Sequence, residues 1–456
     1  MNPKELLDTT FNCECGRSHK VPIKSLVYAE DALERLPNFL ESLVDGRCVL
    51  IVADQRTWVI AGERARQALE QAGWSVRHII VPDADHGSPV CDDTTHYWLD
   101  DRLPSTDIAL AVGCGVINDL TKWLAFEHGL PYAVVATAAT MNGFTAANVA
   151  PAIKGVKTII PAKPPLAVFA IPSVIFNAPF ELTTAGLGDT IAKPLSTADW
   201  LLNHIFCGEY FCRYCSEIIN TLETYYFDRP GDIKNRQPAA IEALFNALLY
   251  SGIAMTIVGT SAPASGGEHL LSHTLDMMSG IDSVAHDLHG RQVGIGTLFA
   301  AAVYERIFQI ETPSCCPFPS DIDSTFWGSL AENVRQQYEQ KKPMLKTMCE
   351  KLTDLPRRGS RRDASQRAGT AGGKTWRAFL AGAKDQVRSP HQIKSCLKTA
   401  GAAHTFADIG CSRERLFSAV LHMHEIRRRP TIIDLAWLLG ILPGAADEII
   451  EHWLTT

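Results

Sequence analysis

The alternation of short apolar segments with amphipathic ones across residues 27–150 is the feature that most restricts the fold of this chain. Four apolar runs have the length and composition of buried parallel strands: 48–53, 76–81, 108–112 and 132–136. Three further segments have helical periodicity: 31–43, 57–72 and 120–128. Repeated strand–helix–strand units predict a doubly wound, Rossmann-like α/β domain that binds its ligand at the carboxyl ends of the strands.

After an apolar run at 167–171, the pattern changes near residues 172–180 and stays helical to the end of the sequence. Seven later segments have strong helical periodicity: 188–202, 239–256, 290–310, 331–352, 392–400, 413–426 and 431–439. We therefore predict an N-terminal extension (1–26), an α/β domain (27–175) and an all-α domain (176–456), with the active site in the cleft between the two domains. The basic segment 357–374 is of low complexity and is predicted to be a flexible surface insertion.

Two turns at the carboxyl ends of predicted strands have the chemistry of a dinucleotide site. Glycines at 113 and 115 precede a helix, where the backbone can approach a diphosphate and the helix N-terminus donates amides. The alternative is a turn that serves packing only, because the full GxGxxG pattern is not met. Asp54 follows the strand 48–53, so its carboxylate can accept hydrogen bonds from a ribose and repel a 2′-phosphate. Its alternative role is to cap the next helix.

Three of the four histidines in the segment 266–297 suggest a metal site. His269 and His273 are four residues apart, so they share one face if this segment is helical, and His289 follows after a loop. Two imidazoles and a carboxylate would give three protein ligands and leave a position open for water or substrate, as a catalytic divalent ion requires. The alternative is a set of ordinary core or surface histidines on unrelated helices.

The composition narrows the class of protein. The 456 residues are 46% hydrophobic and 20% charged, as in an ordinary soluble protein, and a formal net charge of −7 argues against nucleic acid as the main partner. We find no export signal and no apolar run long enough to span a bilayer, and thirteen cysteines lack the spacing of a disulfide framework. We therefore expect a cytoplasmic protein with reduced thiols and no membrane partner.

Cysteines occur in two short patterns that could bind metal. Cys13, Cys15 and His19 could supply three zinc ligands, but no fourth ligand is evident and the spacing is not that of a usual zinc knuckle, which favours a surface turn. Cys212 and Cys215 form a CxxC in a helical stretch without a second pair. For this second pattern we expect neither a redox role nor a metal.

Three segments, GLGDTIAK (186–193), SGGEHLLSH (265–273) and LHGRQVGIGT (288–297), resemble the ligand segments of sn-glycerol-1-phosphate dehydrogenases of the AraM type. That family lies within the superfamily of iron-containing alcohol dehydrogenases, glycerol dehydrogenase and dehydroquinate synthase. The resemblance extends from about residue 12 to 445, interrupted by the basic insertion, and includes the opening around Cys13. It implies the two-domain architecture of dehydroquinate synthase, with dinucleotide bound by 27–175 and metal and substrate bound by 176–456.

The resemblance also implies roles for individual residues. The metal ligands would be Asp189, His269 and His289. Residues with a role in cofactor binding would be Asp54, Gly113, Gly115, Asn118, Asp119, Thr137 and Thr140. Residues with a role in substrate binding would be Asn142, Lys157, Lys193 and His273, and of these Asn142, Lys193 and His273 would also be catalytic, with His273 as a proton relay. Asn142 departs from the family, which has an aspartate at this position.

The function implied is NAD(P)-dependent, metal-dependent reduction of dihydroxyacetone phosphate, or of a close phosphorylated analogue, to sn-glycerol 1-phosphate. NAD is favoured because of Asp54, and the metal is one divalent ion, with zinc favoured over nickel or iron. We also expect a homodimer or larger homo-oligomer. Three alternatives stay open: another alcohol dehydrogenase, a sugar-phosphate cyclase, and a cofactor-binding homologue without catalysis. Against the cyclase, the segment 137–148 differs from the corresponding segment of dehydroquinate synthase.

Overall fold

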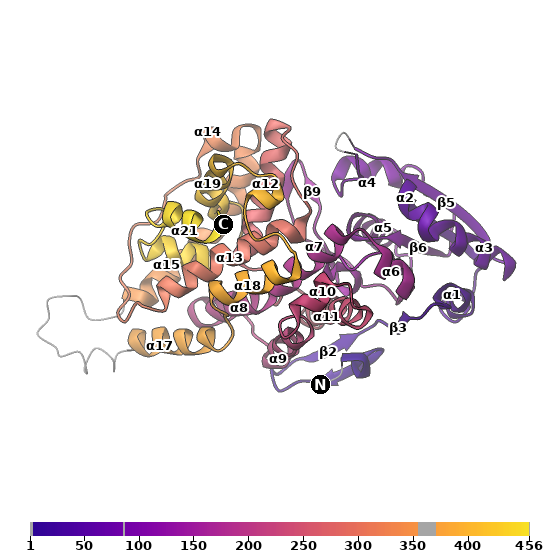
Figure 1. Cartoon of the computed structure of the whole chain (residues 1–456), viewed down its shortest axis with the longest axis horizontal. Coiled ribbons are helices and arrows are strands. Elements are labelled where there is room, and N and C mark those ends of the chain that lie inside the picture. Colours follow the sequence, from indigo (N-terminus) through magenta and orange to yellow (C-terminus); the bar gives the residue numbers. More distant parts are fainter. Residues whose placement is uncertain (1–2, 85–86, 354–370, 456) are drawn as a thin grey trace, which may run out of the picture. The chain divides into compact units, whose positions relative to one another are not determined.

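A computed structural model describes residues 3–84, 87–353 and 371–455 (Figure 1). The chain forms two compact units, and each of them uses two stretches of the sequence. Unit 1 contains Met1–Thr190 and Glu217–Ser261, and unit 2 contains Ile191–Ser216 and Ala262–Thr456. Residues 176–190 and 217–261, which the sequence analysis grouped with the all-α part, therefore pack with the α/β unit.

A six-stranded parallel sheet is the centre of unit 1, in the order β3-β12-β7-β6-β4-β5. Its strands are β3 (Ser25–Tyr28), β4 (Cys48–Asp54), β5 (Ser75–Val81), β6 (Ile108–Gly113), β7 (Tyr132–Ala136) and β12 (Ala167–Ala170). The predicted doubly wound domain is confirmed, since the chain moves outward from β4 to β5 and then returns to the other side of β4. The sequence analysis missed β3, which has only four residues and lies half-buried at the edge.

Helices of unit 1 pack on this sheet through a core that includes Val49, Ile51, Leu110 and Val112. They are α1 (Ala32–Glu41), α2 (Gln55–Thr57), α3 (Glu63–Gln71), α4 (Asp93–Asp100) and α5 (Gly115–Glu127). The predicted single helix at 57–72 is interrupted by a π-helical turn, η2 (Trp58–Gly62). Gly62 is required there, because a Cβ on it would lie 2.7 Å from the Trp58 ring.

Short elements complete the first part of the chain. The helical turn η1 (Pro3–Leu6) precedes a hairpin of β1 (Thr9–Asn12) and β2 (Ser18–Val21). After β7, the 3-10 turn η3 (Asn142–Thr145) leads into two small antiparallel pairs, which are β8 (Asn148–Val149) with β11 (Ile160–Pro161) and β9 (Ala152–Ile153) with β10 (Val156–Lys157). The helix α6 (Pro172–Asn177) follows β12.

The predicted helix at 188–202 is two helices, α7 (Phe180–Ile191) and α8 (Lys193–Cys207). They separate at Ala192 because Pro194, in the first turn of α8, has no N–H to donate to the carbonyl of Thr190. That carbonyl instead accepts a hydrogen bond from the Tyr226 hydroxyl, at 3.4 Å.

The helix α11 (Pro238–Val258) corrects the expectation that no apolar run could span a bilayer. By length and composition it could, but 78% of its most apolar window is buried inside the structure, as in a core helix. It follows α9 (Arg213–Thr221), η4 (Leu222–Tyr225) and α10 (Pro230–Lys234), and it packs against β2, η3 and η4.

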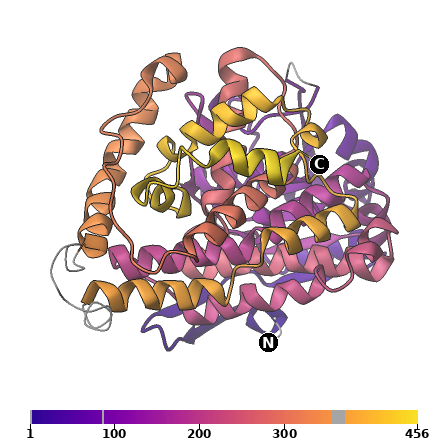
Figure 2. The same cartoon turned by 60° about the vertical axis from the view of Figure 1, so that its left-hand side comes forward.

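The described residues of unit 2 form helices joined by loops, without a strand, and the elements after α8 are coloured from pink through orange to yellow in Figures 1 and 2. After α8, its elements are α12 (Gly267–Asp282), α13 (His289–Ile307), α14 (Ser324–Trp327), η5 (Gly328–Leu330), α15 (Ala331–Thr353), α17 (Ala371–Lys384), α18 (Pro390–Ala400), η6 (Ala407–Ile409), α19 (Arg413–His422), η7 (Met423–Glu425), α20 (Ile432–Leu438) and α21 (Ala446–Leu454). The predicted insertion at 357–374 lies outside the described residues up to Thr370, and its last four residues begin α17.

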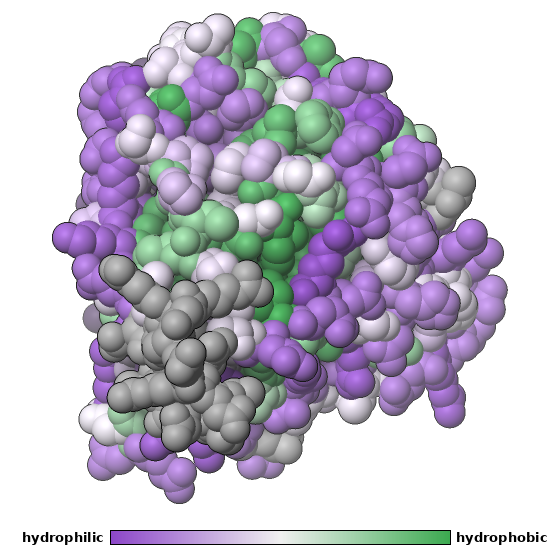
Figure 3. Space-filling model, turned by 90° about the vertical axis from the view of Figure 1, so that its left-hand side faces the viewer, coloured by the Kyte–Doolittle hydropathy of each residue, from purple (hydrophilic) through white to green (hydrophobic). Residues whose placement is uncertain are grey.

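Large aromatic side chains fill the core of unit 2, including Tyr304, Trp327, Tyr338 and Trp376, each 1% exposed or less. Hydrophilic residues cover most of the face shown in Figure 3, with hydrophobic ones gathered near its centre.

The structure also joins Cys315 and Cys349 in a disulfide, with Cα atoms 5.7 Å apart. The expectation that every thiol is reduced is therefore wrong at this pair, which sequence spacing alone could not reveal.

Helices α12 and α13 pack unusually closely where Gly296 of α13 faces the main chain of α12. A Cβ on Gly296 would lie 2.1 Å from the carbonyl oxygen of Glu268, which is far inside van der Waals contact. Gly280 of α12 offers a contrast, because a Cβ there would meet no atom within 4 Å.

Replacing Gly296 with alanine is therefore expected to force the two helices apart and lower the free energy of unfolding by about 1–3 kcal/mol. The matched variant Gly280→Ala should be neutral or raise it by up to about 1 kcal/mol, because alanine loses less entropy in a helix than glycine. Urea unfolding of both variants, followed by circular dichroism, measures the difference. Equal effects of the two substitutions would contradict this account of the packing.

Candidate metal and dinucleotide site

Three histidine rings gather where α12 and α13 pack together. His269 and His273 are one turn apart on α12, and His289 is the first residue of α13. The centroids of the rings are 5.3 Å apart for His269 and His289, 5.7 Å for His273 and His289, and 6.1 Å for His269 and His273. The three imidazoles are thus neighbours, against the alternative that they lie on unrelated helices.

The side chain of Glu268 fixes the orientation of the His269 ring. Glu268 is 1% exposed, and its Oε1 lies 2.8 Å from Nδ1 of His269. The same oxygen accepts hydrogen bonds from the Ser196 hydroxyl at 2.5 Å and from the Gly266 amide at 2.6 Å. Because a carboxylate can only accept, Nδ1 of His269 carries the proton, and the lone pair of Nε2 is available for a metal.

A similar arrangement orients His289. Its Nδ1 lies 2.9 Å from the hydroxyl oxygen of Ser272, and that hydroxyl is 2.8 Å from Oε1 of Gln292. The amide oxygen of Gln292 accepts the hydroxyl proton, so the hydroxyl oxygen accepts the proton of His289 Nδ1. The lone pair of His289 is then also on Nε2.

The predicted carboxylate ligand, Asp189, lies near the end of α7 and is 1% exposed. Its Oδ2 accepts a hydrogen bond from the backbone N–H of Asn142, at 3.1 Å. One ligand atom each from Asp189, His269 and His289 lies within 4.8 Å of the other two. A carboxylate oxygen and two imidazole nitrogens fit a divalent cation such as zinc, and three protein ligands leave a further coordination position for substrate.

The side chain of Asn142 points elsewhere. Its Nδ2 lies 3.2 Å from the sulfur of Met255 on α11, so the group that contacts Asp189 is the backbone amide, which any residue at this position would supply. The presence of asparagine instead of the family's aspartate therefore leaves the backbone contact with Asp189 unchanged.

Lys193, one turn after Asp189, is fully buried at the start of α8, and its ammonium donates to the carbonyl oxygen of Ala264 at 3.1 Å. Lys157 ends β10 and is half-buried. His273 is 8% exposed. The predicted substrate residues Asn142, Lys157, Lys193 and His273 thus come from four different elements.

The predicted diphosphate loop lies at the point where the strand order reverses. β4 is bordered by β5 on one side and β6 on the other, and Ala53 pairs with Val112, so the carboxyl ends of β4 and β6 are side by side. Ligands of doubly wound sheets bind at such a switch point. Gly113 ends β6 and Gly115 begins α5, and the N-cap residue Cys114 makes no capping hydrogen bond with its side chain. The first amides of α5 can therefore bind an anion.

Asn118 and Asp119 of α5, predicted to bind the cofactor, support the next loop in the structure. The Asn118 amide donates to the carbonyl oxygen of Gly143 at 3.2 Å and to Oδ1 of Asp119 at 2.9 Å. Lys122, fully buried one turn later, donates to the carbonyl oxygens of Gly143 and Asn148, at 2.6 and 2.9 Å. Burial lowers the pKa of the Lys122 ammonium, and Asp119 opposes this shift.

Asp54 has the capping role that the sequence analysis gave as its alternative. Oδ1 accepts hydrogen bonds from the amides of Arg56 and Thr57, at 2.8 and 3.0 Å. In return, the hydroxyl oxygen of Thr57 accepts a hydrogen bond from the Asp54 amide. Among the described residues, the contacts of this carboxylate all use Oδ1, so Oδ2 can accept a further hydrogen bond. Thr137 follows β7 and donates its amide to Gly113, at 3.1 Å, and Thr140 is 9% exposed.

Sequence analysis assigned no role to several residues that shape the site, namely Glu268, Ser272, Gln292 and Lys122. Two of them were visible in the segment SGGEHLLSH, where Glu268 directly precedes a predicted ligand and Ser272 lies one turn after Glu268. Their contacts with Nδ1 atoms depend on how α12 and α13 pack, which the sequence does not specify.

Known proteins resemble this chain over most of its length. The family model of iron-containing alcohol dehydrogenases matches residues 27–179. Glycerol-1-phosphate dehydrogenase (NAD(P)+) of Geobacillus stearothermophilus is 32% identical over 333 residues, which are 73% of this chain and 82% of that protein. The enzyme of the same name from Bacillus licheniformis is 30% identical over 435 residues, which are 95% of this chain and 93% of that protein.

Solved structures of low sequence identity share the fold. The crystal structure of a probable glycerol dehydrogenase from Sinorhizobium meliloti 1021 superimposes with a TM-score of 0.59 at 15% identity, covering 94% of this chain and 96% of that one. The likeness to this structure shows the fold alone. The two relatives above, whose length the alignments nearly span, show that the chain belongs to the glycerol-1-phosphate dehydrogenase family, within the iron-containing alcohol dehydrogenases.

Proposed function

We propose that this protein reduces dihydroxyacetone phosphate to sn-glycerol 1-phosphate with NAD(P)H and one divalent metal ion. The observation that carries the proposal is the group formed by Asp189, His269 and His289, whose ligand atoms lie within 4.8 Å of one another. The names of the relatives from Geobacillus stearothermophilus and Bacillus licheniformis support the same reaction. The proposal includes a cytoplasmic location and a homo-oligomeric state.

The three ligands would hold zinc, with nickel or iron as the alternatives. When bound, the ion supplies a Lewis acid that polarises the C2 carbonyl of the substrate, and the nicotinamide supplies the hydride. The protein holds the ligands in place through hydrogen bonds of Glu268 and Ser272 to the two Nδ1 atoms. These contacts fix the tautomers of both imidazoles before the metal arrives, which reduces the cost of binding.

Other residues would bind the substrate and move its proton. Lys193 and Lys157 would supply positive charge for the phosphate, and the donor group of Lys193 is already oriented by Ala264. His273 would deliver a proton to the reduced oxygen, because histidine is the residue type best suited to proton exchange near neutral pH. Asn142 would contact a substrate hydroxyl through its amide oxygen, because its Nδ2 faces Met255.

The cofactor would bind at the carboxyl ends of β4 and β6. Gly113 and Gly115 would face the diphosphate, and the N-terminal amides of α5 would bind its charge. Thr137 and Thr140, which follow β7, would line the same loop region. Asn118 and Asp119 would act by holding the neighbouring loop in place, through their contacts with Gly143 and Ala150.

Removing His289 tests the metal assignment. His289→Ala is expected to lower the metal content by about one ion per chain and to lower kcat/KM by at least about a thousandfold, since the ion lowers the barrier by several kcal/mol. His286→Ala is the matched control, because His286 is an exposed histidine three residues earlier that lies outside the ligand group. Elemental analysis and NADH oxidation assays measure both variants. Equal metal contents of His289→Ala and the wild type would show that the ligand assignment is wrong.

Glu268→Gln tests whether this residue positions His269. Glutamine has the same shape but places an uncharged amide against Nδ1, so the affinity for metal should fall about tenfold to a hundredfold while the protein remains folded. Competition with a fluorescent chelator gives the dissociation constant, and raising the metal concentration should restore kcat. If Glu268→Gln binds metal as tightly as the wild type, Glu268 does not position His269 and serves packing only.

The charge of Asp54 can be separated from its capping role. Asp54→Asn keeps an oxygen that accepts hydrogen bonds from Arg56 and Thr57, so the cap should survive, but it removes the charge that repels a 2′-phosphate. The wild type is expected to prefer NADH, and the variant should lower KM for NADPH relative to KM for NADH. If the ratio of KM for NADPH to KM for NADH is the same in the wild type and the variant, Asp54 does not determine which cofactor is preferred.

A further inference from the structure

A second group of metal-binding side chains is built around the turn of the β1–β2 hairpin. The strands pair in antiparallel register up to Asn12 and Ser18, and the turn is closed by a hydrogen bond from the Cys13 amide to the Arg17 carbonyl, at 2.9 Å. Gly16, with φ of +83°, takes the left-handed conformation that this tight turn requires.

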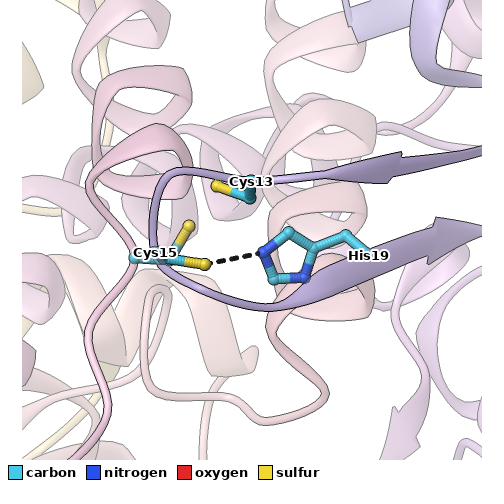
Figure 4. Close-up of side chains that lie close together, drawn as sticks. Cys13, Cys15 and His19 are labelled. Carbon is cyan, nitrogen blue, oxygen red and sulfur yellow. Dashed lines mark hydrogen bonds between the residues drawn. The ribbon is translucent and has the colours of Figure 1, made fainter.

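The turn brings two thiols and an imidazole together (Figure 4). The sulfur of Cys15 lies 3.2 Å from Nε2 of His19. His19 is 3% exposed, and its ring lies against Phe11 with centroids 5.5 Å apart, so the imidazole is held in this orientation by packing. Cys13 projects from the other side of the same turn.

The fourth member of the group is Cys212, which is 0% exposed and directly precedes α9. Ligand atoms of Cys13, Cys15, His19 and Cys212 all lie within 4.8 Å of one another. Local packing explains this placement in part. α9 runs on into η4, η4 packs against α11, and α11 packs against β2. The ligand that the sequence analysis could not find is thus the first cysteine of the CxxC, acting without Cys215.

We propose that Cys13, Cys15, His19 and Cys212 bind a structural zinc ion. Zinc bond lengths of about 2.3 Å to sulfur and 2.0–2.1 Å to nitrogen place tetrahedral ligand atoms about 3.6–3.8 Å apart, so the observed separations need only small adjustments. Three thiolates and one imidazole close the coordination sphere, which is typical of structural zinc and leaves no position for a substrate. The ion would tie the hairpin turn to the start of α9.

Binding also explains why three cysteines and a histidine share one largely buried location. Thiolates out of water are costly unless a cation compensates their charge. Zinc binding releases the protons of the three thiols and forms three Zn–S bonds and one Zn–N bond, without any oxidation. All three cysteines are thiols in the structure, as this chemistry requires.

Zinc stoichiometry of the full-length protein tests the proposal, with His289→Ala as the background that removes the other metal site. In this background, elemental analysis should find about one zinc per chain. Adding Cys15→Ser or Cys212→Ser should reduce it to near zero, whereas adding Cys48→Ser, a half-buried cysteine outside the group, should leave it unchanged. Absence of zinc from the His289→Ala protein, or full retention after Cys212→Ser, would overturn the proposal.

Cobalt substitution gives a second readout that does not depend on the cysteine variants being folded. Cobalt(II) bound by thiolates has a sulfur-to-metal charge-transfer band in the near ultraviolet, and the group of Asp189, His269 and His289 contains no sulfur ligand. The His289→Ala protein loaded with cobalt should therefore show this band. If the band is absent, or if thiol titration shows that two of the three cysteines form a disulfide and zinc is lacking, the site does not exist.

Discussion

The close approach of α13 to the main chain of α12 is the constraint on which the metal group depends. Gly296 permits it, because the Glu268 carbonyl occupies the space that a Cβ would need. The two helices are consecutive and antiparallel, so the distance set at Gly296 also sets the distance at the other end of the contact, where Ser272 reaches both His289 and Gln292. A wider spacing would break these hydrogen bonds and leave the His289 ring without a fixed tautomer.

The orientation of His269 requires the buried carboxylate of Glu268, and the surrounding groups stabilise this negative charge. Burial alone would raise the pKa of Glu268, but hydrogen bonds from His269, Ser196 and Gly266 lower it below the ordinary value. Asp199 lies close by, and burial together with the charge of Glu268 raises its pKa above the ordinary value. Glu268 therefore keeps its charge as the acceptor for Nδ1, and Asp199 is the carboxylate of the pair that takes up a proton more readily.

Much of the fold could be predicted from the sequence because hydrophobic periodicity reports burial directly. Buried strands such as β4 and β6 are continuous apolar runs, and the long helices α11, α13 and α15 were found within a few residues of their ends. The features that were not predicted have local causes. The edge strand β3 is too short to show a period, and the break at Ala192 depends on Pro194 within an otherwise helical pattern.

The candidate site was less accessible to sequence, because side-chain contacts depend on packing. The metal ligands Asp189, His269 and His289 were predicted through resemblance, whereas spacing alone left ordinary core histidines as an equal alternative. Asp54 shows the limit of local reasoning: its position after a strand predicted both a cap and a ribose contact, and only the geometry shows that Oδ1 serves the cap. The contacts of Glu268 and Ser272 with the rings have no signature in the sequence.

The two proposed metal sites differ in a way that follows from their ligands. Asp189, His269 and His289 provide three ligands with no sulfur, so an ion bound there keeps a position that can exchange, and chelators can reach it. Cys13, Cys15, His19 and Cys212 provide four ligands, three of them soft thiolates, so an ion bound there would be enclosed and would exchange only if the hairpin turn opened. Loss of the ion proposed at Asp189, His269 and His289 would therefore leave the ion of the cysteine site bound, and the hairpin would stay in place.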